Sequence, residues 1–182
     1  MRIVGGQFKG RRLQAPRDSR VRPTTDRVRE SLFNIISHAE DDVLQDGHVL
    51  DLFSGTGAFG LEALSRGARS VTFVDNHPAS LGLAKANAET LGVLDACRFI
   101  RSDARRLPAA SQSCSVVFAD PPYEKGLGIP ALEQAQSQGW IDPRAWVLLE
   151  TAAREDVPMP SGLTEENHWK WSDIRVTLFS LA

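Results

Sequence analysis

Strand-like apolar runs alternate with helix-like segments from residue 48 onward, and this alternation leaves few folds open to the chain. Helices are expected up to about Arg66 and from Pro78 to about Leu91, with Gly67 and Gly92 where helix C-caps fall. The expected strands lie at residues 48–53, 70–75, 97–102, 115–119, 145–150, 168–171 and 175–180. This order predicts a largely parallel sheet covered by helices on both faces.

The last two strand-like runs lie too close together for a helical crossover. Only Ser172, Asp173 and Ile174 separate them, so they should form an antiparallel hairpin at the edge of the sheet. The sequence therefore predicts an α/β, Rossmann-like fold with a mostly parallel seven-stranded sheet and an antiparallel edge hairpin.

The N-terminal region has a pattern of its own. Short β-prone pieces around glycines predict a small hairpin within residues 2–13. A helix should follow, with Thr24 or Thr25 as its N-cap, because its apolar residues have helical spacing. Those apolar residues are Val28, Leu32, Ile35, Ile36 and Ala39. We expect a basic N-terminal hairpin or arm over residues 1–24 and a main domain over residues 25–182.

The formal net charge of -2 conceals an asymmetry between the two ends of the chain. Residues 1–30 hold nine Lys and Arg against three Asp and Glu, so this start carries +6 and the remainder -8. A local basic patch can neutralise phosphates whatever the total charge, so the segment is predicted to contact RNA, although a solvated basic arm would look the same. The predicted phosphate contacts are Arg2, Lys9, Arg11, Arg12, Arg22, Arg27 and Arg29. Arg27 and Arg29 could instead pair with Glu30 or Asp26 on the helix surface.

Cysteine, histidine and hydropathy patterns bound the class of protein. Cys97 and Cys114 lie in apolar runs without metal-type spacing, and the four histidines show no ligand spacing, so we expect neither a disulfide nor a metal site. No stretch approaches the roughly 20 apolar residues that span a bilayer, and the start has no signal-peptide core. We expect a cytoplasmic monomer without membrane contact.

A glycine-rich loop follows the first expected strand of the sheet. Gly55, Gly57 and Gly60 satisfy the dinucleotide fingerprint, and Asp75 stands where a ribose-binding carboxylate is expected, so a nicotinamide-dependent dehydrogenase is one interpretation. Asp51, just before the glycines, favours S-adenosylmethionine instead. A carboxylate there suits a cationic ligand and is awkward beside a pyrophosphate.

Ligands of open α/β sheets bind beyond the carboxyl ends of the strands, so acids at successive strand ends should line one crevice. Asp51 would lie near the ammonium group of S-adenosylmethionine, Asp75 would accept hydrogen bonds from the ribose, and Asp103 would meet the adenine amine. A helix cap or surface turn is the alternative for Asp75 and Asp103. The predicted cofactor-binding residues are Asp51, Phe53, Gly55, Thr56, Gly57, Asp75, Asp103 and Ala104.

The turn Asp120-Pro121-Pro122-Tyr123 follows the apolar run of residues 115–119. The two prolines fix φ and leave carbonyl acceptors without competing N–H donors, Asp120 adds a stronger acceptor, and Tyr123 offers a face for stacking. Acceptors beside a ring would bind an exocyclic amine, so these four residues predict the catalytic site of a transferase acting on a nucleobase or a similar amide. An ordinary tight turn is the alternative, since Asp and Pro are common turn residues.

Four segments together resemble the RsmD family of bacterial ribosomal RNA methyltransferases: residues 2–13, 22–30, 51–64 and 120–123. The resemblance implies a class I methyltransferase fold and methyl transfer from S-adenosylmethionine to the exocyclic N2 of one guanine in 16S rRNA. It also implies that the small ribosomal subunit or its late precursor is the substrate. Tyr123 and Asp75 differ from the Phe and Glu that are frequent at these positions in the family. Tyr123 still offers an aromatic ring for stacking, and Asp75 still offers a carboxylate acceptor.

The mechanism expected from these residues localises the lone pair of the guanine amine. Asp120 and the Pro121 carbonyl would accept the two amine hydrogens, and Tyr123 would stack on the extruded base. Whether Asp120 also takes the proton stays open. Three alternatives compete with this interpretation: an adenine-N6 methyltransferase that uses the same turn, a nicotinamide-dependent dehydrogenase, and a non-catalytic ribosome-assembly factor.

Overall fold

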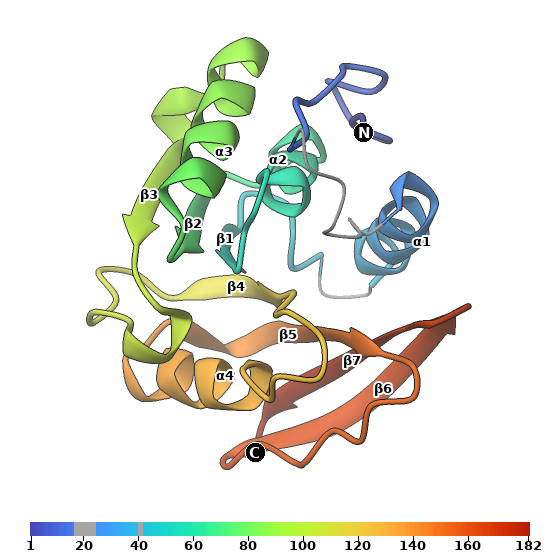
Figure 1. The fold of residues 1–182 in the computed structure, drawn as a ribbon, viewed down its shortest axis with the longest axis vertical. Coiled ribbons are helices and arrows are strands. Elements are labelled where there is room, and N and C mark those ends of the chain that lie inside the picture. The colour runs from blue at the N-terminus through green and yellow to red at the C-terminus, as the bar shows by residue number, and fades with distance from the viewer. Residues whose placement is uncertain (17–24, 40–41) are drawn as a thin grey trace.

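The described strands form one sheet in the order β3-β2-β1-β4-β5-β7-β6 (Figure 1). The computed structural model describes residues 1–16, 25–39 and 42–182. The strands are β1 (His48–Leu52), β2 (Ser70–Asp75), β3 (Cys97–Arg101), β4 (Cys114–Ala119), β5 (Ile141–Ala152), β6 (Leu163–Trp171) and β7 (Ile174–Leu181). Strands β1 to β5 pair in parallel, whereas β7 pairs antiparallel with β5 and β6. The predicted parallel sheet with an antiparallel edge hairpin is confirmed.

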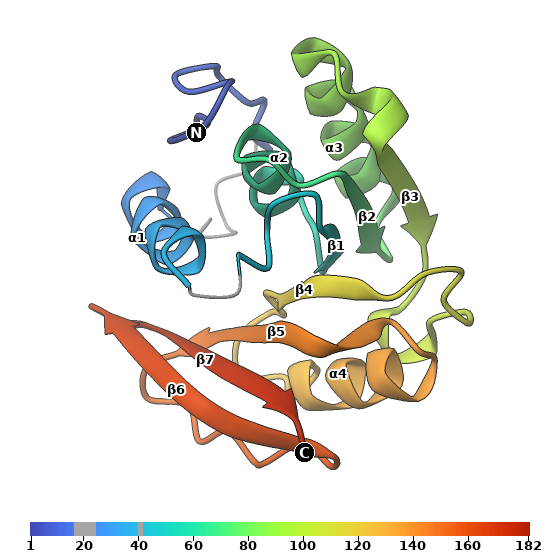
Figure 2. The ribbon, with the colours of Figure 1, turned by 180° about the vertical axis from the view of Figure 1, so that it is seen from behind.

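Helices cover both faces of this sheet. They are α1 (Asp26–Ser37), α2 (Ala58–Ser65), α3 (Pro78–Leu91) and α4 (Gly128–Ser137), with short 3-10 turns η1 (Leu94–Ala96) and η2 (Ala104–Arg106). Successive residues of a strand face opposite sides, so Phe118 packs with the apolar residues of α1, α2 and α3, and Val117 packs with those of α4. Figures 1 and 2 show the resulting layers from front and back.

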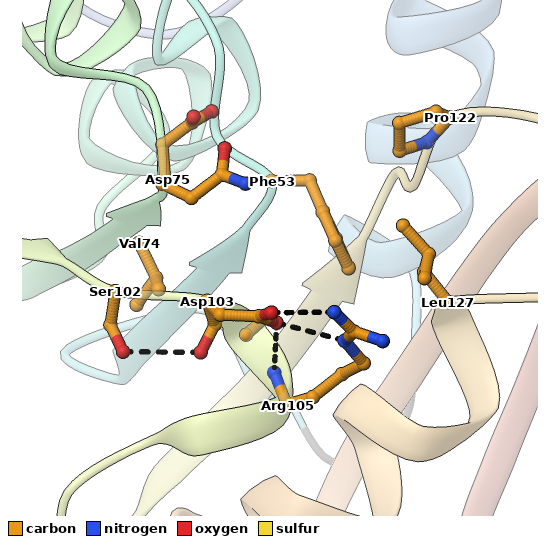
Figure 3. A pocket seen from close by; sticks show the side chains of 10 residues that line it. Phe53, Val74, Asp75, Ser102, Asp103, Arg105, Pro122 and Leu127 are labelled. Atoms are coloured by element: carbon orange, nitrogen blue, oxygen red, sulfur yellow. Dashed lines mark hydrogen bonds and ion pairs between the residues drawn. The ribbon is translucent and has the colours of Figure 1, made fainter. Parts of the chain in front are cut away.

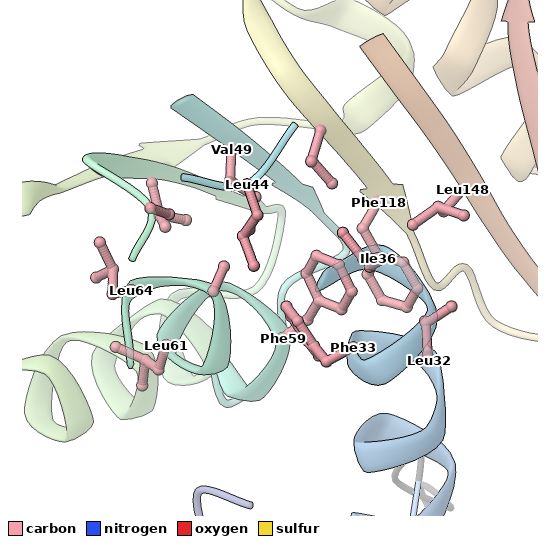
Figure 4. Packing of buried hydrophobic residues seen from close by; sticks show 14 of the residues in the cluster. Leu32, Phe33, Ile36, Leu44, Val49, Phe59, Leu61, Leu64, Phe118 and Leu148 are labelled. Carbon is pink, nitrogen blue, oxygen red and sulfur yellow. The ribbon is translucent and has the colours of Figure 1, made fainter. Parts of the chain in front are cut away.

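Three phenylalanines join α1 and α2 to the sheet (Figure 4). The ring of Phe59, on α2, stacks on Phe118 of β4 with 3.9 Å between centroids, and Phe33 of α1 lies 4.7 Å from Phe59. Such pairs contribute roughly 0.5–1.5 kcal/mol each beyond the burial of their area. The stack holds α1 beside the carboxyl end of β4.

The strand order reverses between β1 and β4. Along the chain β2 and β3 extend the sheet on one side of β1, whereas β4 and β5 extend it on the other. Leu52 and Ala119 are register partners at the ends of these two strands. The glycine loop after β1 and the turn after β4 therefore start side by side, at the switch point where open α/β sheets form their ligand crevice.

The N-terminal segment, residues 1–16, forms a hairpin-like turn. Its one β-bridge pairs Arg2 with Arg12, and the N–H of Ile3 donates to the carbonyl of Arg11 at 2.9 Å. The predicted hairpin is thus closed by backbone hydrogen bonds with little regular strand.

The same segment is packed onto the main domain. Ile3 and Leu13 are buried in the core with α1 and α2. The N–H of Gln14 donates to the buried side chain of Asn87 on α3 at 2.7 Å, and the amide of Asn87 donates back to the Gln14 carbonyl at 3.1 Å. Residues 1–16 therefore share the core of the main domain, and the predicted boundary after residue 24 falls beside residues outside the described part.

Glu62 is a fully buried carboxylate that joins three segments. It accepts hydrogen bonds from Nε of Arg66 at 2.8 Å and from the backbone N–H of Val4 at 2.9 Å. The guanidinium of Arg29, on α1, lies 3.7 Å away. A buried charge is tolerated only when it is paired and hydrogen-bonded, so this junction fixes the N-terminal segment and α1 on α2.

Three parts of the fold differ from the sequence-based assignment. Strand β6 begins at Leu163, although the apolar alternation starts only at residue 168, because most side chains of an edge strand face solvent and need no apolar pattern. No pattern predicted α4, whose third residue is Pro130. Proline is tolerated there because the first turn of a helix does not use its N–H groups. Strand β5 is also longer at both ends than expected.

Replacing Glu62 by Gln should destabilise the protein by roughly 3–5 kcal/mol, because it leaves two arginines without their buried partner. Urea denaturation of Glu62→Gln beside the wild type measures this loss. Glu89→Gln, on the exposed side of α3, is the matched control and should change stability by less than about 0.5 kcal/mol. Equal stabilities of the two variants would contradict the role of the junction.

Candidate active site

A cavity of about 590 Å³ lies at the switch point of the sheet. The glycine loop lines one side and the turn of residues 120–123 lines another. Met1 and Pro16 of the N-terminal segment and Leu32 of α1 also border it. Segments that are far apart in the sequence thus enclose one site.

The glycine loop depends on backbone geometry that glycine allows. Gly57 has φ +77° where α2 begins, and a Cβ there would lie 3.0 Å from the Cβ of Ala84. A Cβ on Gly60 would lie 2.5 Å from the ring of Phe73. These glycines let α2 pack close to β2 and α3.

Two acids close the glycine loop. Asp51 accepts a hydrogen bond of 3.0 Å from the N–H of Gly60, and Asp75 accepts one of 3.0 Å from the N–H of Gly55. The other oxygen of Asp75 accepts from the N–H of His77 at 2.8 Å. Carboxylate oxygens have two lone pairs each, so Asp75 can still accept hydrogen bonds from a ligand in the cavity.

A smaller pocket of about 80 Å³ adjoins the cavity and shares Phe53, Asp75, Asn76 and Pro122 with it (Figure 3). Asp103 lies in this pocket and is held by Arg105, whose Nη2 is 2.6 Å and whose Nε is 3.0 Å from the carboxylate oxygens. This hydrogen-bonded pair lowers the pKa of Asp103 to about 2. The sequence identified Asp103 but not its partner Arg105.

The turn after β4 brings Asp120, Pro121, Pro122 and Tyr123 to the cavity. Burial raises the pKa of Asp120, and the neighbouring carboxylates of Glu150 and Asp51 raise it further. Burial also raises the pKa of Asp51, against the effect of its hydrogen bond from Gly60. Acids that resist ionisation together make a site that favours a positively charged ligand.

Sequence reasoning missed Glu150, which is 1% exposed on β5. Its carboxylate accepts a hydrogen bond of 2.9 Å from the hydroxyl of Tyr123. The sequence signal that could have identified it is an acid that directly follows the apolar residues Val147, Leu148 and Leu149 in an expected buried strand.

The predicted phosphate contacts divide into two groups. Exposed side chains at the N-terminal segment and α1 are those of Arg2, Lys9, Arg11, Arg12 and Arg27. Arg29 is only 2% exposed, where its guanidinium contacts Asp26 and Glu62 and donates to the carbonyl of Arg2. The expected surface contact of Arg29 with phosphate is therefore corrected, because a buried and paired guanidinium stabilises the fold. Arg22 lies outside the described residues.

Within residues 1–16, 25–39 and 42–182, none of the helices has the length and apolar character needed to span a bilayer. The same part of the chain holds no group of three His, Cys, Asp or Glu that could bind a metal ion.

The sheet order, the glycine loop and the acids at the strand ends define the class I methyltransferase fold. The chain superimposes on a solved structure from Escherichia coli that is described as the methyltransferase yhhF, with a TM-score of 0.83 and 32% sequence identity. The match covers 100% of this chain and 97% of that one. The family model "Conserved hypothetical protein 95" matches residues 1–180. The chain belongs to this family, which is the RsmD family recognised from its motifs.

Curated relatives agree with this membership. "Ribosomal RNA small subunit methyltransferase D" of Escherichia coli is 37% identical over 159 residues, which are 87% of this chain and 78% of that protein. The protein of the same name from Haemophilus influenzae is 32% identical over 171 residues, which are 92% of this chain and 84% of that one.

The raised pKa of Asp120 makes a prediction about stability. A carboxyl whose pKa is higher in the folded state favours folding below its unfolded pKa and loses that contribution as the pH rises through its folded pKa. As the pH rises from 5 to 8, the free energy of unfolding of Asp120→Asn should therefore increase relative to that of the wild type. Urea denaturation of both proteins at pH 5 and at pH 8 measures this difference. Asp95→Asn, at an exposed site, is the control. If the unfolding free energies of Asp120→Asn and the wild type differed by the same amount at the two pH values, the raised pKa of Asp120 in the folded state would be contradicted.

Proposed function

We propose that this protein transfers a methyl group from S-adenosylmethionine to the exocyclic N2 of a guanine in 16S rRNA. The observation that carries the proposal is the shared cavity, which the glycine loop and the turn Asp120–Tyr123 both line and which the basic N-terminal segment borders. The relatives named as small subunit methyltransferases support ribosomal RNA as the substrate class. The small subunit or its late precursor is the proposed partner.

The residues at the cavity fit a cationic donor. Asp51, Asp75 and Asp120 place three carboxyl groups around it, which an ammonium and a sulfonium would offset and a pyrophosphate would oppose. This charge argument disfavours the nicotinamide alternative. S-adenosylmethionine supplies an electrophilic methyl group on a positively charged sulfur.

Each part of the donor has residues suited to hold it. Gly55, Thr56 and Gly57 would lie along the methionine part, with Asp51 near the ammonium. Asp75 would accept from the ribose hydroxyls. Phe53, Asp103 and Ala104 line the smaller pocket, where an adenine ring would find apolar walls and a carboxylate acceptor for its amine.

The Asp-Pro-Pro-Tyr turn would act on the base. Asp120 and the Pro121 carbonyl would accept the two amine hydrogens, so the nitrogen lone pair localises and is aimed at the donor. Pro121 and Pro122 keep the turn rigid because their rings fix φ. Tyr123 would stack on the extruded base, an interaction worth about 1–3 kcal/mol. The amine proton would leave to water or to Asp120.

The substrate would be held through its backbone. Exposed basic side chains lie on the N-terminal segment, whose Met1 and Pro16 border the cavity, and at the start of α1: Arg2, Lys9, Arg11, Arg12 and Arg27. Phosphate contacts of this kind position a nucleic acid without reading its sequence. An adenine-N6 amine would need the same acceptors, so the turn does not separate the two bases. The relatives named as small subunit rRNA methyltransferases favour the RNA substrate over DNA.

Labelled methyl transfer to unmethylated small ribosomal subunits tests the reaction and the substrate together. Digestion of the RNA should yield labelled N2-methylguanosine from 16S rRNA. Asp120→Asn should reduce the transfer about 100-fold or more while S-adenosylhomocysteine still binds. N6-methyladenosine would move the protein to the adenine alternative. No transfer by the wild type to subunits or naked rRNA would leave the assembly-factor alternative.

The salt dependence of subunit binding tests the basic segment. Each phosphate contact contributes about 0.7–0.9 to the slope of log K against log salt, so Arg11→Gln with Arg12→Gln should reduce the slope by about 1.5. The matched control is Arg144→Gln with Lys170→Gln, which removes two exposed charges on β5 and β6. An unchanged slope for the Arg11 and Arg12 variant would refute this contact.

A further inference from the structure

Glu150 is a buried acid directly beside the proposed catalytic turn. Ala119 of β4 and Leu149 of β5 are register partners in the parallel pair. The next residues along the two strands are Asp120 and Glu150. Their position explains why Glu150 is the largest charged influence on the pKa of Asp120 after burial itself.

The hydroxyl of Tyr123 donates to the Glu150 carboxylate at 2.9 Å. The backbone N–H of Asp120, at the other end of the turn, donates to the carbonyl of Leu52 at 3.4 Å. Both ends of the turn are therefore held by neighbouring strands of the sheet. The phenol can rotate about two side-chain torsions, and a hydrogen bond from its far end to a fixed strand removes that freedom.

Glu150 is 1% exposed on β5, between Leu149 and Thr151, and its charge opposes the ionisation of Asp120. A buried acid that lies beside a proposed catalytic turn and accepts a hydrogen bond from a residue of that turn points to a role in the reaction.

We propose that Glu150 is a positioning residue, which holds the Tyr123 ring as a preformed wall for the extruded base. The inference rests on the proposed function, because the wall matters only if a base enters the cavity. Glu150 touches neither donor nor base in this role. It acts through the Tyr123 hydroxyl, so removing that hydroxyl should make Glu150 dispensable for turnover.

The contact can be measured without any activity. Tyr123 is the single tyrosine of the chain, so the difference absorbance of tyrosinate reports this ring alone. Burial raises the pKa of Tyr123, and Glu150 raises it further by its charge and hydrogen bond, with smaller effects of Asp120 and Asp173. Glu150→Gln keeps the volume and an acceptor oxygen but removes the charge. Tyrosinate should therefore form at lower pH than in the wild type, while far-UV circular dichroism shows the fold intact.

A double-mutant cycle measures the role in transfer. Glu150→Gln and Tyr123→Phe should each lower kcat on small subunits about three- to tenfold, the effect of weakening one hydrogen bond. The double variant should be no slower than Tyr123→Phe, and S-adenosylhomocysteine affinity should stay unchanged in all three. Glu165→Gln, whose partners are His168 and Arg175 away from the cavity, is the control for removing a paired acid.

The outcomes separate this inference from the proposed function. Effects that multiply in the double variant would show that Glu150 supports the fold independently of Tyr123, and would overturn the inference. An unchanged tyrosinate titration in Glu150→Gln would overturn it as well. A wild type that methylates no subunit would overturn the proposed function, and the titration would still decide whether Glu150 holds the ring.

Discussion

The buried carboxylate of Glu62 is the contact on which the walls of the site depend. It binds α2 to Arg29 of α1 and to the backbone of Val4, so three segments are fixed relative to the sheet. Those segments carry Met1, Pro16 and Leu32 to the rim of the cavity. The two arginines offset the charge, and the exclusion of water strengthens their attraction to it.

The site uses the opposite arrangement of charge. The acids of the site lie close to one another: Glu150 and Asp51 both raise the pKa of Asp120, and Asp75 raises the pKa of Asp51. Such a group destabilises the fold and raises the affinity for a cationic ligand, because binding relieves the repulsion. The same protein thus pairs a buried acid with two arginines where the fold needs it, and gathers several acids where a donor would bind. This contrast is the physical basis for proposing S-adenosylmethionine.

Much of the fold and the placement of the strand-end acids could be predicted from local patterns. The alternating runs predicted the parallel strands and the edge hairpin, although β5 and β6 begin earlier than expected. Thr25 caps α1, and the acids at the strand ends line one crevice or its adjoining pocket. The patterns failed where burial decides the role. Arg29 is a charged residue of the kind usually found on the surface of a helix, yet its side chain is buried because it pairs with the buried carboxylate of Glu62. In addition, no local sequence pattern indicated α4.

The sequence by itself determined the order of the strands, the glycine loop and the Asp-Pro-Pro-Tyr turn. Each of these depends on neighbouring residues, through side-chain period, φ preference and missing N–H groups. Only the tertiary structure decided which polar side chains meet. Glu62 with Arg29, and Glu150 with Tyr123, are pairs separated by 33 and 27 residues. Their contact follows from strand register and helix packing, which arise when the whole chain buries its apolar surface.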